Sequence, residues 1–171
     1  MTTARLDRIN LRILEELQGN ARITNQELAE KVALSPSACL ARVKKLEAEG
    51  ILRRFTADIR LEKVERILEA FIEVTLEHHS LKEVQRFLDA AKLHPHMVSC
   101  HRVSGHYDYL LHVVARDMPQ LREIADHLLS GGLGVSKIAT IPILDEIKPF
   151  AGLPLRALLR DPGDATAESA E

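Results

Sequence analysis

Residues 24–50 read TNQELAEKVALSPSACLARVKKLEAEG and contain two helix-start signals separated by a short turn. Thr24 and Glu27 match a capping box, in which each side chain caps the other residue's backbone N–H, and predict a helix that begins at the next residue. Ser35 before Pro36 predicts a second helix, because serine is a good N-cap and proline is favoured at the first helical position. The closing glycine is the expected end of that helix. Since about three residues remain between the helices, the stretch predicts a helix-turn-helix.

The second of these helices divides into an apolar face and an outer face. Apolar residues at three- and four-residue spacing are predicted to face the core, namely Cys39, Leu40, Val43 and Leu46. The outer face is small near the helix start and basic further along, and it holds Ser37, Ala38, Ala41 and Lys45, flanked by Arg42 and Lys44. Small residues let a backbone approach base edges, and cations then meet phosphates. The alternative interpretation is an ordinary solvated helix face.

The neighbouring residues complete a small helical unit of about fifty residues. An apolar stripe predicts a first helix that opens near Asp7 and ends at Gly19-Asn20. After Gly50, residues 51–58 are predicted to be extended and to form a short wing-like or linking strand. The two arginines of this stretch, Arg53 and Arg54, could contact phosphates, or they could be solvated surface.

The second half of the chain alternates between strand-like and helix-like patterns. Strands are predicted over residues 70–77, 97–103, 107–115 and 135–147, and helices after the N-caps Ser80 and Asp117. The order β-α-β-β-α-β is that of a ferredoxin-like fold, so the chain is predicted to be α+β. Because both helices of this fold pack on one face of the sheet, we expect a second subunit to cover the other face in a dimer.

The charge distribution supports two domains and a tail. Residues 1–60 hold 11 Lys and Arg against 8 Asp and Glu, whereas residues 61–171 hold 12 against 17. A basic part joined to an acidic part is typical of a domain that binds a polyanion, such as nucleic acid, attached to a domain that does not. We therefore predict a helix-turn-helix domain with a linking strand at 1–60, a ferredoxin-like domain at 61–160 and a polar, disordered tail at 161–171.

Other classes of function have little support in the sequence. No apolar run reaches the roughly 18 residues of a membrane span, and the N-terminus lacks a secretory signal. The two cysteines are far apart, which fits a reducing cytoplasm. Eight histidines raise the question of a metal site, but no metal-binding spacing, phosphate-binding loop or nucleophile elbow accompanies them. We therefore expect no catalytic residue, metal or cofactor and no membrane partner.

Three blocks of sequence together resemble the Lrp/AsnC family of transcription regulators, also called feast/famine proteins. The blocks are LDRINLRILEELQGNARITNQELAEKV, LSPSACLARVKKLEAEGIL and CHRVSGHYDYLLHV, the last with a Gly-x-Tyr-Asp-Tyr segment. ARDMPQLREIADHLL and LDEIKP also fit in position, so the resemblance runs from Leu6 to Lys148. It implies a regulator that binds double-stranded DNA at a pseudo-palindromic operator, forms dimers and octamers, and binds an amino acid or related metabolite between sensing domains of adjacent dimers.

The resemblance also implies which residues perform these roles. By position, the DNA readers are Ser35, Ser37, Arg42, Lys44 and Lys45, and Ala38 joins them on the outer face. The effector loop is Ser104, Gly105, His106, Tyr107 and Asp108, with Met118, Thr140, Ile141 and Pro142 near it. Asp108 is expected to fix a ligand amine, and its alternative role is that of a turn-exit residue bonded to its own backbone.

The chain departs from the family pattern at two of these positions, and two other functions are open. His106 stands where many relatives carry an acidic residue, and Pro142 removes a backbone donor from a strand. Both leave the identity of the effector open. A tetrapyrrole-modifying decarboxylase on the same architecture is the alternative from another class, and a pure assembly scaffold is the third.

Overall fold

A computed structural model describes residues 6–158 of the chain, which form two compact units. The first contains residues 6–58 together with 148–158, and the second contains residues 59–147. The chain therefore returns to its first unit after it has completed the second, whereas the sequence assigned all residues up to 160 to the second domain. The predicted tail at 161–171 lies outside the described residues.

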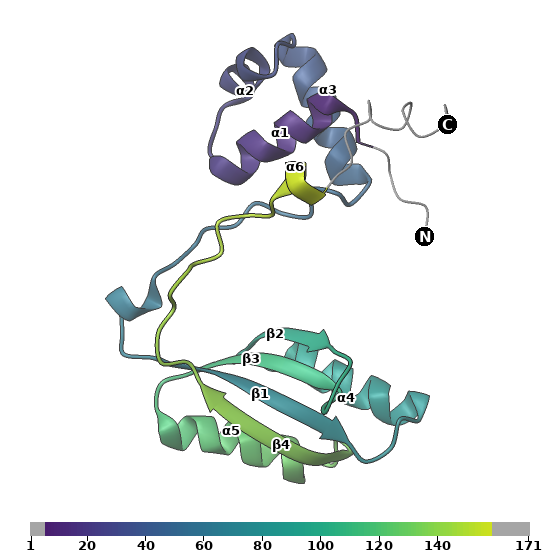
Figure 1. Cartoon of the computed structure of the whole chain (residues 1–171), viewed down its shortest axis with the longest axis vertical. Coiled ribbons are helices and arrows are strands. Elements are labelled where there is room, and N and C mark those ends of the chain that lie inside the picture. Colours follow the sequence, from purple (N-terminus) through teal and green to yellow (C-terminus); the bar gives the residue numbers. More distant parts are fainter. Residues whose placement is uncertain (1–5, 159–171) are drawn as a thin grey trace, which may run out of the picture. The chain divides into compact units, whose positions relative to one another are not determined.

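The first unit begins with three helices, α1 (Arg8–Gly19), α2 (Asn25–Lys31) and α3 (Pro36–Ala48), seen at the top of Figure 1. The predicted N-caps Thr24 and Ser35 are confirmed, because their side chains accept a backbone N–H of the helix that follows. Asp7, near which the first helix was predicted to open, caps α1 in the same way. The capping box at Thr24 is complete on both sides. These local signals need no tertiary contact, which is why the sequence located all three helix starts.

An apolar core and a few polar contacts hold the three helices together. The fully or nearly buried residues are Ile13, Leu14, Leu17, Leu28, Ala29, Val32, Cys39 and Leu46. The side-chain amide of Asn25 donates to the carbonyl of Pro36 at 2.9 Å and so joins the first turns of α2 and α3. Lys31 of α2 contacts α1 twice, through an ion pair with Glu16 at 2.6 Å and through its carbonyl, which accepts from Arg12.

The turn between α2 and α3 contains a backbone conformation that suits glycine better than its own residue. Ala33 has φ of +56°, and among residues 6–158 it is the one non-glycine with positive φ. A side chain in the left-handed region crowds its own carbonyl. Gly50, which ends α3 as predicted, has φ of +69° and no such penalty.

The predicted strand at 51–58 does not form. Residues 53–60 are irregular and exposed, and a short 3₁₀ helix, η1 (Leu61–Lys63), follows them. A strand needs a neighbour to receive its backbone hydrogen bonds, and within residues 6–158 none pairs with this segment. Its extended appearance in sequence therefore marks a connector.

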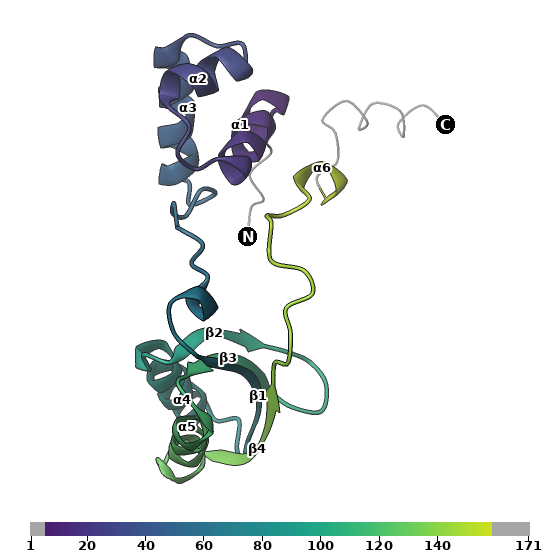
Figure 2. The ribbon, with the colours of Figure 1, turned by 90° about the vertical axis from the view of Figure 1, so that its left-hand side faces the viewer.

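The second unit is a four-stranded antiparallel sheet with two helices on one face (Figures 1 and 2). Its elements are β1 (Leu68–Leu76), α4 (Leu81–Leu93), β2 (Met97–Arg102), β3 (Tyr109–Ala115), α5 (Met118–Ser130) and β4 (Val135–Pro142). The strand order is β2-β3-β1-β4. The element order and sheet order confirm the predicted ferredoxin-like α+β fold.

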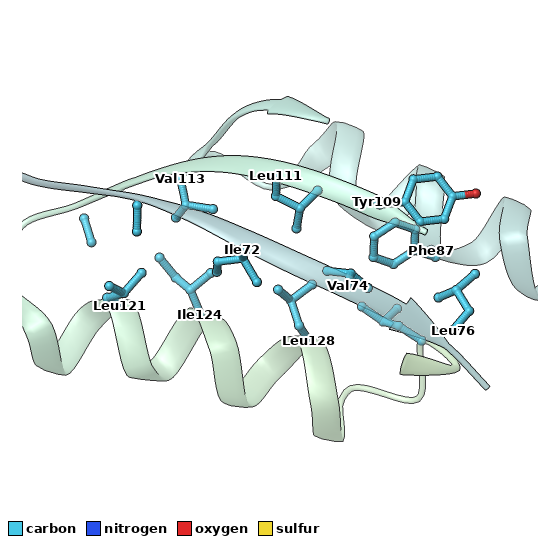
Figure 3. Packing of buried hydrophobic residues seen from close by; sticks show 13 residues of the cluster. Ile72, Val74, Leu76, Phe87, Tyr109, Leu111, Val113, Leu121, Ile124 and Leu128 are labelled. Atoms are coloured by element: carbon cyan, nitrogen blue, oxygen red, sulfur yellow. The ribbon is translucent and has the colours of Figure 1, made fainter. Parts of the chain in front are cut away.

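The core of this unit lies between the sheet and its helices. Alternate residues of β1 and β3 are buried, as the two-residue period of a strand dictates. Figure 3 shows Ile72 and Val74 directed toward the buried side chains Leu121, Ile124 and Leu128 of α5. The rings of Phe87 and Tyr109 pack with their centroids 4.8 Å apart.

The last strand is shorter than the sequence predicted. β4 ends at Pro142 instead of continuing to residue 147, and it lies at the edge of the sheet beside β1. Proline has no N–H to donate, so edge positions and strand ends tolerate it best. One further bond, from the N–H of Ile143 to the carbonyl of Glu69 at 2.8 Å, closes the pairing.

Ala33→Gly is expected to raise the free energy of unfolding of the first unit by about 1 kcal/mol, because glycine removes the left-handed strain from the folded state. The higher conformational entropy of the unfolded glycine chain offsets part of this stabilisation. Gly50→Ala should do the opposite by about the same amount, since its φ is similar and nothing lies within 4 Å of the added Cβ. Thermal unfolding followed by helical circular dichroism measures both. A shift of the same sign in the two variants would contradict the strain argument.

Candidate functional site

The outward side of α3 is the first candidate site. Its exposed residues are Ser37, Ala38, Leu40, Ala41, Lys44 and Lys45, whereas Cys39 and Leu46 are buried. The predicted inward position of Leu40 is wrong, because its side chain is 43 % exposed. A helix turns 100° per residue, so the stripe set by Cys39, Val43 and Leu46 leaves Leu40 on the neighbouring outer side.

The N-terminal end of α3 is held by its serines. The hydroxyl of Ser35 accepts the N–H of Ala38 at 3.3 Å and lies 3.2 Å from the hydroxyl of Ser37. The cap hydrogen bond fixes the helix start, and because both serines are exposed, this start remains accessible to a ligand. Small exposed residues at the first turns permit the close approach that base edges require.

Two lysines follow on the same face. Lys45 is 70 % exposed and its Nζ lies 3.7 Å from Glu49 one turn later. A surface ion pair of this kind stabilises a helix by well under about 1 kcal/mol, so an anion can replace it. Lys44 is exposed and makes no ion pair with any other residue in the described range 6–158. The face therefore combines small residues and available positive charge.

Arg42 lies elsewhere than the sequence placed it. Its guanidinium donates to the carboxylate of Asp7 at 2.6 Å and to the side-chain oxygen of Asn10 at 2.9 Å, both at the start of α1. Burial alone would raise the pKa of Asp7, but the Asn10 N–H and the Arg42 guanidinium hold that pKa below its ordinary value. Arg42 is thus engaged with α1, and its two acceptors compete with any phosphate.

The second candidate site is the loop between β2 and β3. Ser104, Gly105 and His106 are exposed at its tip, while Tyr107 and Asp108 are half-buried where β3 begins. The N–H of Val103 donates to the carbonyl of Asp108 at 3.0 Å and closes the loop. The loop therefore presents a short, defined set of backbone and side-chain polar groups.

Asp108 fixes the end of β1. Its carboxylate accepts the backbone N–H of Leu76 at 2.8 Å and contacts Nε2 of His79 at 2.8 Å, and its own N–H donates to Val74. Burial would raise the pKa of Asp108, but the Leu76 and His79 hydrogen bonds lower it. The carboxylate is bonded to another strand, and neither sequence interpretation anticipated His79 as its partner.

The remaining predicted effector residues lie on the edge strand β4 and after the end of β3. Asp108 immediately precedes Tyr109, which pairs with Val74 near the end of β1, whereas Pro142 pairs with Ala70 near its start. Thr140 and Ile141 are exposed on β4, and Met118 is the first residue of α5, just after β3 ends. At about 3.3 Å per residue, Asp108 is separated along the strands from Thr140 by roughly 10 Å and from Pro142 by roughly 17 Å, and β4 lies two strands away from β3. Met118 lies beyond the far end of β3.

The face of the sheet opposite the helices is uncovered. By the alternation of β1 and its register, this face carries Phe71, Leu110, Val114, Ala139 and Ile141. Among them lies a polar pair, with Nε2 of His112 2.8 Å from the carboxylate of Glu69. The same register also places Glu73, Thr75 and Lys137 on this face. A face of apolar residues with polar residues along one end has the composition of a protein–protein interface.

The histidines considered for a metal have other contacts. Nδ1 of His96 lies 2.9 Å from the carbonyl of Val114, and the rings of His94 and His127 lie 6.2 Å apart. Burial, with the neighbouring His96 and His127, lowers the pKa of His94. Within residues 6–158, no group of three His, Cys, Asp or Glu side chains is arranged to hold a metal ion. No helix in this range is long and apolar enough to cross a membrane.

Comparisons with known proteins match both units. A family model described as winged helix-turn-helix DNA-binding covers residues 6–53, and one described as Lrp/AsnC ligand binding domain covers residues 69–153. The leucine-responsive regulatory protein of Escherichia coli is 36 % identical over 143 residues, which are 84 % of this chain and 87 % of that protein.

Two solved structures share the architecture. A transcriptional regulator from Neisseria meningitidis, solved as its L-methionine complex, has a TM-score of 0.80 and 38 % identity, covering 90 % of this chain and 99 % of its own. An AsnC family transcriptional regulator from Agrobacterium tumefaciens has a TM-score of 0.80 and 29 % identity, covering 90 % and 100 %.

Asp108→Ala is expected to destabilise the second unit at pH 7 by about 1–3 kcal/mol, because it leaves the N–H of Leu76 without an acceptor. Because the pKa of Asp108 is lowered by folding, its contribution is present above about pH 4 and is lost as the pH falls through the lowered value. The difference in the free energy of unfolding between wild type and variant should therefore disappear only at acid pH. Thermal unfolding across pH measures it, with exposed Asp145→Ala as the control, and equal stabilities at pH 7 would contradict the role.

Proposed function

This chain belongs to the Lrp/AsnC family of DNA-binding, ligand-responsive transcriptional regulators, and we propose that it reads its operator by placing α3 in the major groove. The observation that carries the proposal is the outward face of α3, which is exposed, small at its start and cationic further along. In a helix-turn-helix, the first turns of the second helix contact base edges while neighbouring cations contact the phosphates.

The residues divide by role. We assign Ser37, Ala38 and Ala41 to the base edges, where Leu40 adds an apolar group suited to a thymine methyl. Lys44 and Lys45 are assigned to phosphates, because both are exposed. Ser35 acts at the helix start as a cap. We assign no phosphate contact to Arg42, because its guanidinium already donates to Asp7 and Asn10.

A dimer is part of the proposal, because one recognition helix covers too few base pairs to select a site. The uncovered sheet face, with its apolar residues around His112 and Glu69, is the surface we assign to the dimer. Two α3 helices then read half-sites about one turn, or ~34 Å, apart, which requires a pseudo-palindromic operator. Further association of dimers, to octamers, would raise the local concentration of DNA-binding units.

An amino acid is the proposed effector, and we place its site between copies of the chain. The support is the register of the sheet, which separates the loop Ser104–Asp108 from Met118 and Thr140–Pro142. Within one chain these groups lie on different strands and at least about 10 Å apart, so we infer that residues of a second chain complete the surroundings of a small ligand. Relatives named for leucine and solved with L-methionine point to the same ligand class.

The effector acts by favouring one state of the assembly. It changes DNA binding only if it binds one arrangement of copies more tightly than another, and the coupling is reciprocal. Exposed His106 is the residue of the loop we assign to ligand selectivity. Since the family models and relatives are those of transcription regulators, the decarboxylase alternative is not carried further. We place the protein in the cytoplasm, where it meets its DNA.

Lys44→Ala is expected to weaken binding to the protein's own upstream DNA and to reduce the slope of log K against log salt by about 0.9, the value for one phosphate contact. Arg42→Ala removes the same charge from the same helix and is the matched control. It should weaken binding by loosening α3 from α1 and leave the slope unchanged. Fluorescence anisotropy over a salt series measures both, and a flattened slope for Arg42→Ala alone would reverse the assignment.

A thermal-shift screen of the L-amino acids, including leucine and methionine, is expected to find a stabilising ligand. At a hundred times its dissociation constant, such a ligand stabilises by about 2.7 kcal/mol. His106→Ala should remove the shift, and exposed His78→Ala should retain it. A panel without any shift would contradict the amino-acid class, and a shift that survives in His106→Ala would exclude this residue from the site.

A further inference from the structure

After the sheet is complete, the chain returns to α1 and ends its described part there as α6 (Leu155–Leu158). We call residues 150–158 the strap. The guanidinium of Arg156 donates to both carboxylate oxygens of Glu15, at 2.6 and 2.8 Å. Two parallel charge-assisted bonds fix orientation as well as distance. The hydrogen bond from Arg156, with its charge, lowers the pKa of Glu15.

A second contact involves the backbone of the strap. The side-chain amide of Gln18 accepts the N–H of Leu153 at 2.7 Å and donates to its carbonyl at 3.2 Å. The preceding residue, Gly152, has φ of +106°, and an added Cβ there would come within 3.0 Å of the Gln18 amide oxygen. The strap thus approaches α1 as closely as its backbone allows.

A third contact is apolar. Leu155 is half-buried and packs against the core of the three-helix unit. That core is formed by residues of α1, α2 and α3, and α6 contacts α1. The ion pair and the backbone–amide pair join four residues of the strap, 153–156, to four residues of α1, 15–18, and the apolar contact of Leu155 adds to them.

α1 is also the helix on which α3 is fixed. At its N-terminal end, Asp7 and Asn10 hold the guanidinium of Arg42, whereas the strap occupies Glu15 and Gln18 two turns later. A displacement of the strap would therefore also displace α1, the helix that contacts α3 and sets its orientation. α1 is rigid over this length, because it is a continuous helix of 12 residues.

The sheet supplies the other end of this connection. The segment before β1 and the segment after β4 start at neighbouring positions, since Ala70 pairs with Pro142 and Ile143 donates to Glu69. The helical unit is thus joined covalently to the same end of two adjacent strands, once through residues 59–67 and once through residues 143–149. A unit held at two points has fewer orientations than one held by a single flexible connector.

We propose that the strap is a positioning element for DNA reading: through Arg156 and Leu153 it clamps α1 and so restricts the orientation of α3 relative to the dimer. This inference rests on the proposed function, because the orientation matters only if two α3 helices read spaced half-sites. Arg156 is a positioning residue here and makes no contact with DNA.

A disulfide tests the docking itself. The Cβ built at Gly152 lies 3.5 Å from the Cβ of Gln18, within the range of a disulfide. In the full-length Gln18→Cys/Gly152→Cys protein, oxidation should give a cross-link within one chain, seen as a reducible mobility change at monomer mass on a denaturing gel. Each single variant, which keeps Cys39 and Cys100, is the control. A cross-link that joins two chains, or none at all, would overturn docking within the chain.

Charge reversal tests the role without the strain of the cross-link. Arg156→Glu and Glu15→Arg should each weaken binding to the upstream DNA about three- to tenfold at a temperature where the protein is folded. The double reversal, which keeps the net charge, should restore affinity to within about twofold. The salt slope should stay that of wild type in all three. A lowered slope for Arg156→Glu that the double reversal does not rescue would make Arg156 a phosphate contact and overturn the proposal.

Half-site spacing separates positioning from simple stabilisation. Five base pairs inserted between the half-sites of the upstream DNA turn one half-site to the opposite side of the helix. Wild type should bind the native DNA much more tightly than the DNA with the insertion. In Arg156→Glu, the ratio of the two affinities should fall to half the wild-type value or less. If the strap only stabilised the unit, both affinities would fall and the ratio would persist, which would overturn the inference. Failure of wild type to bind either DNA would instead overturn the proposed function, while the disulfide would still report on docking.

Discussion

The contact of Arg42 with Asp7 and Asn10 determines which side of the recognition helix faces outward. It ties the middle of α3 to the first turn of α1, next to the buried stripe formed by Cys39 and Leu46. With that side fixed inward, the small residues and lysines have no neighbour to cover them and remain available. The chemistry of the outward face that we propose to read DNA thus depends on a cation that is bonded to α1.

The arrangement of the second unit underlies the proposal that a ligand binds between copies of the chain. Its helices cover one face of the sheet, and the loop before β3 and the edge strand β4 lie two strands apart. In this proposal, residues of a second chain complete the surroundings of the ligand. A ligand that bridges copies changes assembly as a direct result of binding, with no need for a separate conformational relay.

The helix starts and the ferredoxin-like fold were predicted from the sequence, whereas individual contacts between distant residues were not. The N-caps at Thr24, Ser35, Ser80 and Asp117 were all predicted, because a cap is decided within four residues of chain. The exposure of Leu40 was missed, since periodicity alone does not show which partner helix a face meets. The strap was missed for the same reason: Arg156 and Glu15 are 141 residues apart, and no pattern links them.

Pro142 has a consequence for how copies can be added. β4 is an edge strand, and such an edge offers free backbone donors and acceptors to any extended chain that lies beside it. A residue without an N–H interrupts that row at the end of the strand. Pairing of a further strand at this end of the edge is therefore discouraged, which favours face-to-face association in the dimer that we propose.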